Sequence, residues 1–242
     1  MSVRPRAKER ARPLVVLARA ADIARRHRTR VAVGALACLV APAVGSALLA
    51  ELILGDDLPA IGTALVGLAM TVVSAGGVVV FVGYLDLVAH HHRHGRTPGS
   101  LGELVRKLPV RRLLAADVVL VAMFAVGSAL LLVPGLIVLT WYGLVGSMIV
   151  TGGATSVRDG FALSRRIVRG HFLLVFSMVT VPLILEHDIV LVTEHAIEDS
   201  SDMTGIVAGI VIILLVNVTV ALVEVVLAED LRRELPPAPA PA

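Results

Sequence analysis

Four polar or acidic side chains lie inside, or within two residues of, stretches of sequence that are apolar enough to cross a membrane. These side chains are Asp86, Asp117, Asn217 and Glu224. Ionisable groups at membrane depth are costly and usually mark a function or pair with one another. The three acids lie near the ends of their stretches that border basic segments, so we expect ion pairs there. The expected partners are Arg112, Arg165, Arg166 and Arg232. We expect the amide of Asn217 to hydrogen-bond another helix.

Two histidine-containing segments carry residue types that bind metal ions. The first runs from His90 to His94, but no carboxylate lies nearby in sequence and Arg93 would repel a cation. We interpret it as a basic turn beside the membrane. The second mixes carboxylates with imidazoles at 186–188 and 194–195, which is a better ligand set for zinc or calcium. Further acids follow it and favour a solvated acidic loop, so we predict no metal site and no cofactor.

A third set of residues could bind anions. Four arginines, Arg158, Arg165, Arg166 and Arg169, follow Ser156, which with Asp159 three residues later predicts the start of a helix. Most of these arginines form a stripe along one side of the predicted helix, next to a stripe of apolar residues, as in a helix that lies in the membrane interface. A second such helix is predicted from Ser100 and Glu103. We expect the four arginines to contact lipid or a protein partner.

The sequence offers no constellation of catalytic residues. It has no His-Glu-x-x-His motif, no glycine-rich phosphate loop and no recognisable nucleophile with its base. The single cysteine, Cys38, lies in an apolar run and excludes a disulfide framework or a cysteine-based metal site. We therefore predict that the protein is not an enzyme.

The elements that position these residues are predicted to be transmembrane helices. Of the 242 residues 57% are hydrophobic, and the mean hydropathy is +0.87, which is more apolar surface than a soluble domain hides. About 20 apolar residues span a bilayer as a helix. Six stretches qualify, the fourth of them short: Val31–Leu54, Ala60–Tyr84, Leu113–Val133, Leu136–Val150, His171–Val192 and Gly205–Ala228. We predict an all-α, polytopic protein of about six transmembrane helices with two cytoplasmic interfacial amphipathic helices.

The distribution of charge predicts the orientation. All 22 Lys and Arg residues fall before Val31, between His90 and Arg112, in 151–170, or after Ala228. The alternate loops carry acids instead. The positive-inside rule places all four basic segments, and hence both termini, in the cytoplasm, which requires an even number of spans. Attraction to anionic lipid heads accounts for the basic pI, so we expect no nucleic-acid partner.

Smaller features predict packing and local geometry. Gly76-Gly77 and the pair Gly205 and Gly209 are spaced for close helix contact, within one chain or in a homo-oligomer. Pro182 is expected to bend its helix. Pro134-Gly135 is expected to end the third span and turn the chain into the fourth. Similar segments at 84–87 and 228–231 hint at an internal repeat.

Three segments together resemble a known family. They read Leu-Leu-Val-Pro-Gly-Leu-Ile at 131–137, Ser-Val-Arg-Asp-Gly-Phe-Ala-Leu-Ser-Arg-Arg-Ile-Val-Arg-Gly-His-Phe at 156–172, and Ala-Glu-Asp-Leu-Arg-Arg-Glu at 228–234. The pattern resembles the integral membrane domain attached to some glycerophosphoryl diester phosphodiesterases and found alone in many bacterial proteins. The resemblance implies a six-helix bundle. The phosphodiesterase activity of that family belongs to a separate soluble barrel, so it is not carried over.

These observations predict three parts of the chain: a basic cytoplasmic segment at 1–30, a membrane domain at 31–234 and a disordered Pro/Ala tail at 235–242. We expect a multi-pass protein of a bacterial inner (plasma) membrane. Its expected role is that of a non-enzymatic accessory, scaffold or lipid-interacting subunit, with anionic head groups and a membrane protein as candidate partners. The alternatives are a small transporter or channel, and a membrane enzyme that acts on lipids.

Overall fold

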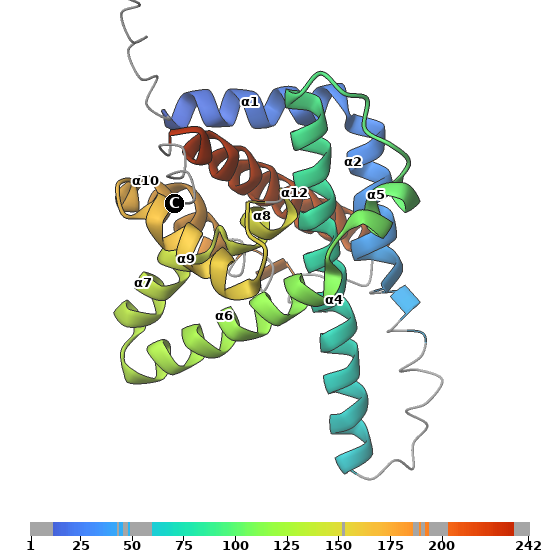
Figure 1. The fold of residues 1–242 in the computed structure, drawn as a ribbon. Coiled ribbons are helices and arrows are strands. Elements are labelled where there is room, and N and C mark those ends of the chain that lie inside the picture. Colours follow the sequence, from blue (N-terminus) through green and yellow to red (C-terminus); the bar gives the residue numbers. More distant parts are fainter. Residues whose placement is uncertain are drawn as a thin grey trace, which may run out of the picture.

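The computed structural model describes residues 12–42, 44–45, 48, 60–151, 153–185, 189, 192–193 and 203–234. Every regular element among them is a helix (Figure 1), which confirms the all-α prediction. In chain order the elements are α1 (Pro13–Arg26), α2 (Arg28–Ala35), η1 (Leu36–Val40), α4 (Ala60–Arg93), α5 (Leu101–Lys107), α6 (Val110–Leu130), α7 (Leu132–Tyr142), α8 (Val145–Val150), α9 (Val157–Val168), α10 (Phe172–Val175), η2 (Phe176–Thr180) and α12 (Met203–Glu234). The two η elements are π-helical turns.

Four helices are long and apolar enough to cross a membrane: Val66–Arg93, Val110–Leu130, Leu132–Val150 and Val207–Arg233. A fifth crossing exists if the bent pair Val157–Val168 and Phe172–Leu185 counts as one span. Large apolar side chains such as Leu68, Val118 and Leu132 are exposed along these helices, as expected of surfaces that face lipid. The protein is therefore a multi-pass membrane protein. The count of six stays a prediction, because the stretch Val31–Leu54 continues outside the described residues.

The turn between α6 and α7 lies earlier than the sequence predicts. The chain reverses at Leu131, whose backbone is extended, and Pro134-Gly135 lies inside the first turn of α7. Proline is tolerated there because the first N–H groups of a helix have no partner within it. The two helices pack closely at their glycines, since a Cβ on Gly127 would lie 2.9 Å from the backbone nitrogen of Gly135.

Both π-helical turns end two residues before a proline. Proline has no N–H and its ring pushes away the carbonyl group four residues earlier, which is Cys38 for Pro42 and Met178 for Pro182. The helix widens in response, and the N–H of the residue after each π turn bonds the carbonyl oxygen five residues back. The irregularity expected at Pro182 thus takes the form of a π-helical turn.

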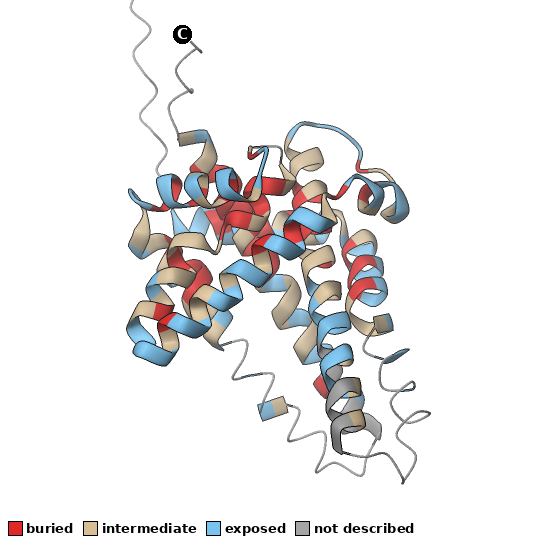
Figure 2. Cartoon of the chain, turned by 60° about the horizontal axis from the view of Figure 1, so that its bottom comes forward, coloured by how far each residue is buried: buried red, intermediate tan, exposed pale blue. Residues whose placement is uncertain are grey.

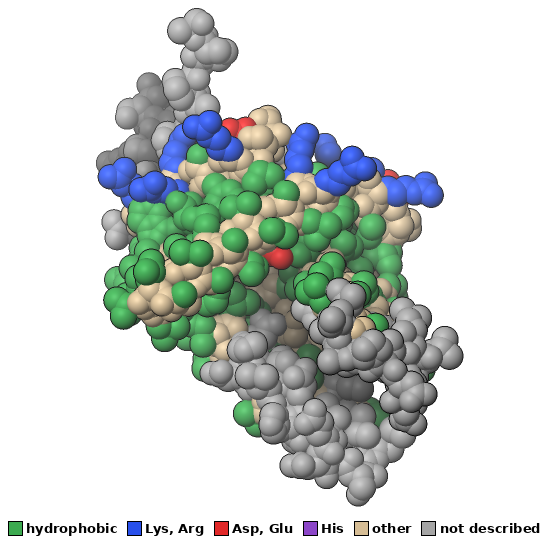
Figure 3. All heavy atoms as spheres, turned by 90° about the horizontal axis from the view of Figure 1, so that it is seen from below, with side chains coloured by type: hydrophobic (Ala, Val, Ile, Leu, Met, Phe, Trp, Pro, Cys, Tyr) green, Lys and Arg blue, Asp and Glu red, His purple; other side chains and the backbone are tan. Residues whose placement is uncertain are grey.

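The basic segments gather at one end of the molecule, which we call the basic end. Contacts join α1 to α12, the end of α4 to α1, and the segment after α8 to the end of α12. The helices α4 and α12 therefore both end there, and the residues that follow α8 lie beside the end of α12. Lys and Arg side chains line one edge of the surface beside an apolar expanse (Figure 3), and the buried residues concentrate near the same end (Figure 2).

Candidate functional site at the basic end

A buried arginine joins α4 to α12. The last residue of α4, Arg93, is paired through Nε with Oε2 of Glu229 at 2.7 Å and through Nη1 with Oδ1 of Asp230 at 2.6 Å. Its Nη2 also donates to the carbonyl oxygen of Val226. All three charged side chains are less than a tenth exposed. The ion pairs between a buried cation and two carboxylates are costly to break, because each partner would be left charged and poorly solvated.

The same pair of acids reaches α1 and a histidine. Arg19 of α1 donates to Oδ2 of Asp230 at 2.7 Å. On the other side, Nδ1 of His90 lies 3.2 Å from Oε1 of Glu229. Glu229 and Asp230 therefore hold three elements together at one point, which we call the α1–α4–α12 junction.

A second contact between α1 and α4 is made by histidines. Nε2 of His27 lies 3.1 Å from Nδ1 of His92, and the rings meet edge to face. Burial lowers the pKa of His27, and the neighbouring His92 lowers it further. His92 also lies 3.8 Å from Asp22, whose pKa is lowered chiefly by its hydrogen bond with Arg26. Both effects favour the neutral form of the His27 ring in this contact.

The junction borders an open recess. Its volume is about 380 Å³, and the side chains around it are mostly charged: Arg19, Asp22, Ile23, His92, Arg93 and Arg233. Two of its arginines are already paired with Asp230. The recess is therefore polar, with three arginines and one acid in its lining, unlike the apolar pockets that hold small organic ligands.

The buried acid Asp86 lies one helical turn before His90. It is 1% exposed, and neither carboxylate oxygen accepts a hydrogen bond from a described residue. Ser147 of α8 and Glu229 of α12 lie near enough to act on it electrostatically, and the Ser147 hydroxyl forms no hydrogen bond with a described residue. The structure therefore brings Asp86 to the junction, but without the arginine partner that we expected.

The other polar residues predicted inside the membrane lie on α6 and α12. Asp117 is half-buried on α6, and Glu224 lies on α12. Asn217 donates to the carbonyl oxygen of Ile213 in its own helix, so the bond that we expected to another helix is not the one observed. Of the expected arginine partners, Arg232 donates to the carbonyl and hydroxyl oxygens of Thr151.

The arginine-rich helix forms as predicted. Ser156 caps α9 by accepting a hydrogen bond from the N–H of Asp159 at 3.1 Å, and Ser100 caps α5 in the same way. The α9 arginines are exposed, namely Arg158, Arg165, Arg166 and Arg169. The opposite side of α9 is buried, and Gly160 allows close contact with Ile149 of α8. The ion pairs formed by described residues use other basic side chains, so these four arginines present their charge to the surroundings.

The junction residues were not predicted as a site. Arg93 is separated from Glu229 and Asp230 by more than 130 residues, and no local spacing links it to them. The one available signal was the similarity between segments 84–87 and 228–231, which the structure places on the facing helices α4 and α12. The acidic groups at 186–188 and 194–199, and Asp202, lie outside the described residues.

Comparison of this chain with known protein families, curated proteins and solved structures found no relative. No family model matches the chain, and neither the curated proteins nor the solved structures include a significant match. The similarity to the phosphodiesterase-associated membrane domain therefore stays a prediction that rests on the three segments quoted above.

Proposed function

We propose that this protein is a non-enzymatic accessory or scaffold subunit of a bacterial inner membrane, and that its basic end binds anionic lipid head groups at the cytoplasmic surface. The observation that carries the proposal is α9, a capped helix that buries one side against α8 and exposes four arginines on the other. Guanidinium groups suit phosphate recognition because they donate two parallel hydrogen bonds.

The neighbours of α9 favour a position at the membrane surface. The helix that follows it turns by 106° and is apolar, so α9 runs across the direction of that helix. Ser164 of α9 donates to the carbonyl oxygen of Trp141, and the guanidinium of Arg165 lies 4.9 Å from the centre of the same indole ring. Tryptophan is enriched where lipid meets water. Leu173, just beyond α9, is 77% exposed and fits the apolar side of that boundary.

Simple electrostatics gives the expected strength. A basic residue near an anionic membrane surface contributes about 1 kcal/mol, so removal of three arginines costs about 3 kcal/mol. Each 1.4 kcal/mol is a factor of about ten in affinity. The preference for anionic over zwitterionic lipid should therefore fall by roughly a hundredfold.

The test compares the wild type with the variant Arg165→Ala/Arg166→Ala/Arg169→Ala, extracted from a bacterial membrane with its surrounding lipids. Lipids and crosslinked proteins that copurify are identified by mass spectrometry. The control, Arg96→Ala/Arg106→Ala/Arg111→Ala, removes the same charge from exposed positions of the preceding basic loop.

We expect the wild type and the control to retain phosphatidylglycerol or cardiolipin, and the α9 variant to lose it. Equal retention by all three proteins would refute a lipid site on α9. Equal loss in both variants would show that net charge alone attracts the lipid.

A further inference from the structure

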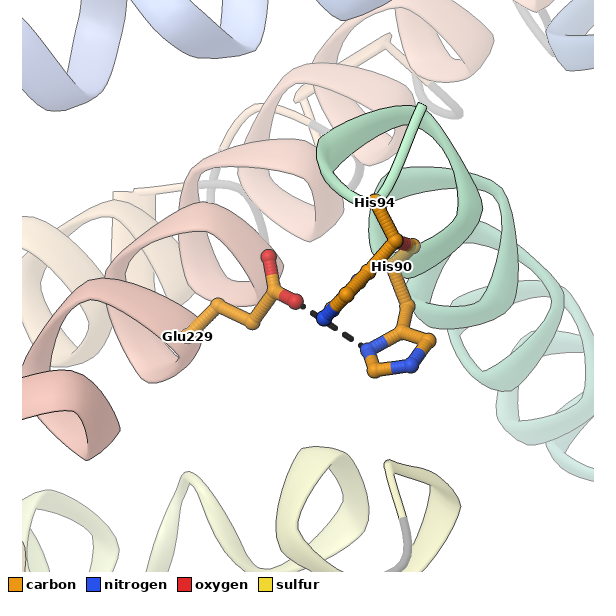
Figure 4. A group of neighbouring side chains, drawn as sticks. All are labelled: His90, His94 and Glu229. Atoms are coloured by element: carbon orange, nitrogen blue, oxygen red, sulfur yellow. Dashed lines mark hydrogen bonds and ion pairs between the residues drawn. The ribbon is translucent and has the colours of Figure 1, made fainter. Parts of the chain in front are cut away.

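The end of α4 and the facing turn of α12 bring together three side chains that bind metal ions. His94 directly follows the last residue of α4 and lies one helical turn after His90, so both side chains project from the same side of this chain segment. Glu229 projects toward them from α12 (Figure 4). One ligand atom from each residue lies within 4.8 Å of the others. We propose that His90, His94 and Glu229 bind a divalent transition-metal ion of the Zn²⁺ class.

Hydrogen bonds orient the three groups. Nδ1–H of His94 donates to the carbonyl oxygen of His90 at 2.7 Å, which leaves the lone pair of Nε2 available to a metal. The Oε2 atom of Glu229 faces Nε of Arg93, so Oε1 is the atom that faces His90. Outer contacts of this kind hold ligands in place before the ion arrives.

The charges around the group accommodate a cation. Arg93, which at first sight repels one, is paired with both Glu229 and Asp230, and Arg19 adds a second positive charge at Asp230. Asp86 adds a third carboxyl group without a hydrogen bond, one turn before His90. The carboxylates of Glu229 and Asp230 therefore balance the guanidinium groups of Arg93 and Arg19, so these arginines leave no net positive charge to repel an ion.

The donor set selects the kind of ion. Two imidazole nitrogens and one carboxylate oxygen suit Zn²⁺, whereas Ca²⁺ and Mg²⁺ prefer oxygen ligands alone. Zn²⁺ takes four ligands, and His94 is exposed, so water can supply the fourth. The ion would join α4 to α12 across the same turn that Arg93 already bridges. This inference does not depend on lipid binding by α9.

Zinc binding is measured on the full chain, purified in mild detergent through an affinity tag without histidine. A fluorescent zinc chelator competes for the ion at pH 7.5. The test variants are Glu229→Gln and His94→Asn, and the control is His91→Asn. His91 belongs to the same histidine run, but its Nδ1 bonds the carbonyl oxygen of Leu87 and it lies outside the group.

We expect one zinc ion per chain in the wild type and in the control, and a loss of affinity of roughly tenfold or more in both test variants. The side chain of the exposed His94 bonds the nearby carbonyl oxygen of His90 and joins no other described helix by a hydrogen bond, so His94→Asn tests the site even if Glu229→Gln weakens the fold. Absence of zinc binding by the wild type would overturn the proposal. Binding by Glu229→Gln equal to the wild type, with His91→Asn impaired, would show adventitious binding by the histidine run.

Discussion

Replacement of Gly77 by alanine should separate α4 from η1. A Cβ at this position would lie 2.1 Å from the carbonyl oxygen of Cys38, where ordinary contacts begin at 3.4 Å. The obstacle is backbone, so no side-chain rotation relieves it, and the two helices must move apart by about 1 Å. Overpacking of this kind typically costs about 1–3 kcal/mol. We expect the upper part of that range for Gly77→Ala.

The adjacent glycine provides a matched control. A Cβ on Gly76 would meet no atom within 4 Å, and alanine favours a helix over glycine by up to about 1 kcal/mol. Gly76→Ala should therefore be as stable as the wild type or slightly more stable. The two variants differ only in which side of α4 carries the added methyl group.

The assay uses the only cysteine of the chain. Cys38 is 8% exposed in η1, so a maleimide dye labels it only when the helices separate or unfold. On heating in detergent, Gly77→Ala should be labelled at a temperature roughly 5–10 °C below the wild type. If Gly77→Ala and Gly76→Ala melt together, η1 does not approach α4 as closely as described.

Three further predictions concern the basic end. Arg93→Met leaves Glu229 and Asp230 buried without their cation, and should lower the free energy of unfolding by about 3 kcal/mol or more; Arg25→Ala, in an exposed ion pair, should leave the denaturation midpoint unchanged. Ser156→Ala removes the cap of α9 at a cost of about 1 kcal/mol, so its amides should exchange hydrogen faster, while Ser156→Thr should not change them. The pKa of His27 is lowered below 6.5 in the folded protein. As the pH drops below 6.5 the unfolded chain therefore takes up the proton first, and the stability of the folded protein should fall. His27→Gln should weaken this pH dependence, and an unchanged melting curve of the wild type from pH 7.5 to 5.5 would contradict the prediction.

Local patterns in the sequence predicted the helices and their starts. Runs of apolar residues specify membrane helices because the backbone must satisfy its own hydrogen bonds in lipid. The caps at Ser100 and Ser156 depend on residues three positions apart, and both formed. The turn at Leu131 was missed because Pro134-Gly135 is equally compatible with a helix start.

The junction depended on information that no local pattern contains. Arg93 meets Asp230 across 137 positions in sequence, and nothing in either segment specifies the other. The acids predicted at membrane depth, Asp86, Asp117 and Glu224, were expected to pair with arginines that flank the spans, namely Arg112, Arg165, Arg166 or Arg232. Arg93 was instead assigned to a basic, histidine-rich turn beside the membrane, although α4 continues as far as Arg93.

The orientation of the basic end tests the account most directly. Single cysteines at Ser2, Thr97 and Thr155, in a Cys38→Ser background, place one probe in each of the first three basic segments, and Asp57→Cys probes an acidic loop. A membrane-impermeant maleimide is applied to intact spheroplasts and to inverted vesicles. The account predicts labelling of the first three positions only in inverted vesicles and of position 57 only in spheroplasts. Labelling of any basic-segment probe in intact spheroplasts would contradict a cytoplasmic basic end.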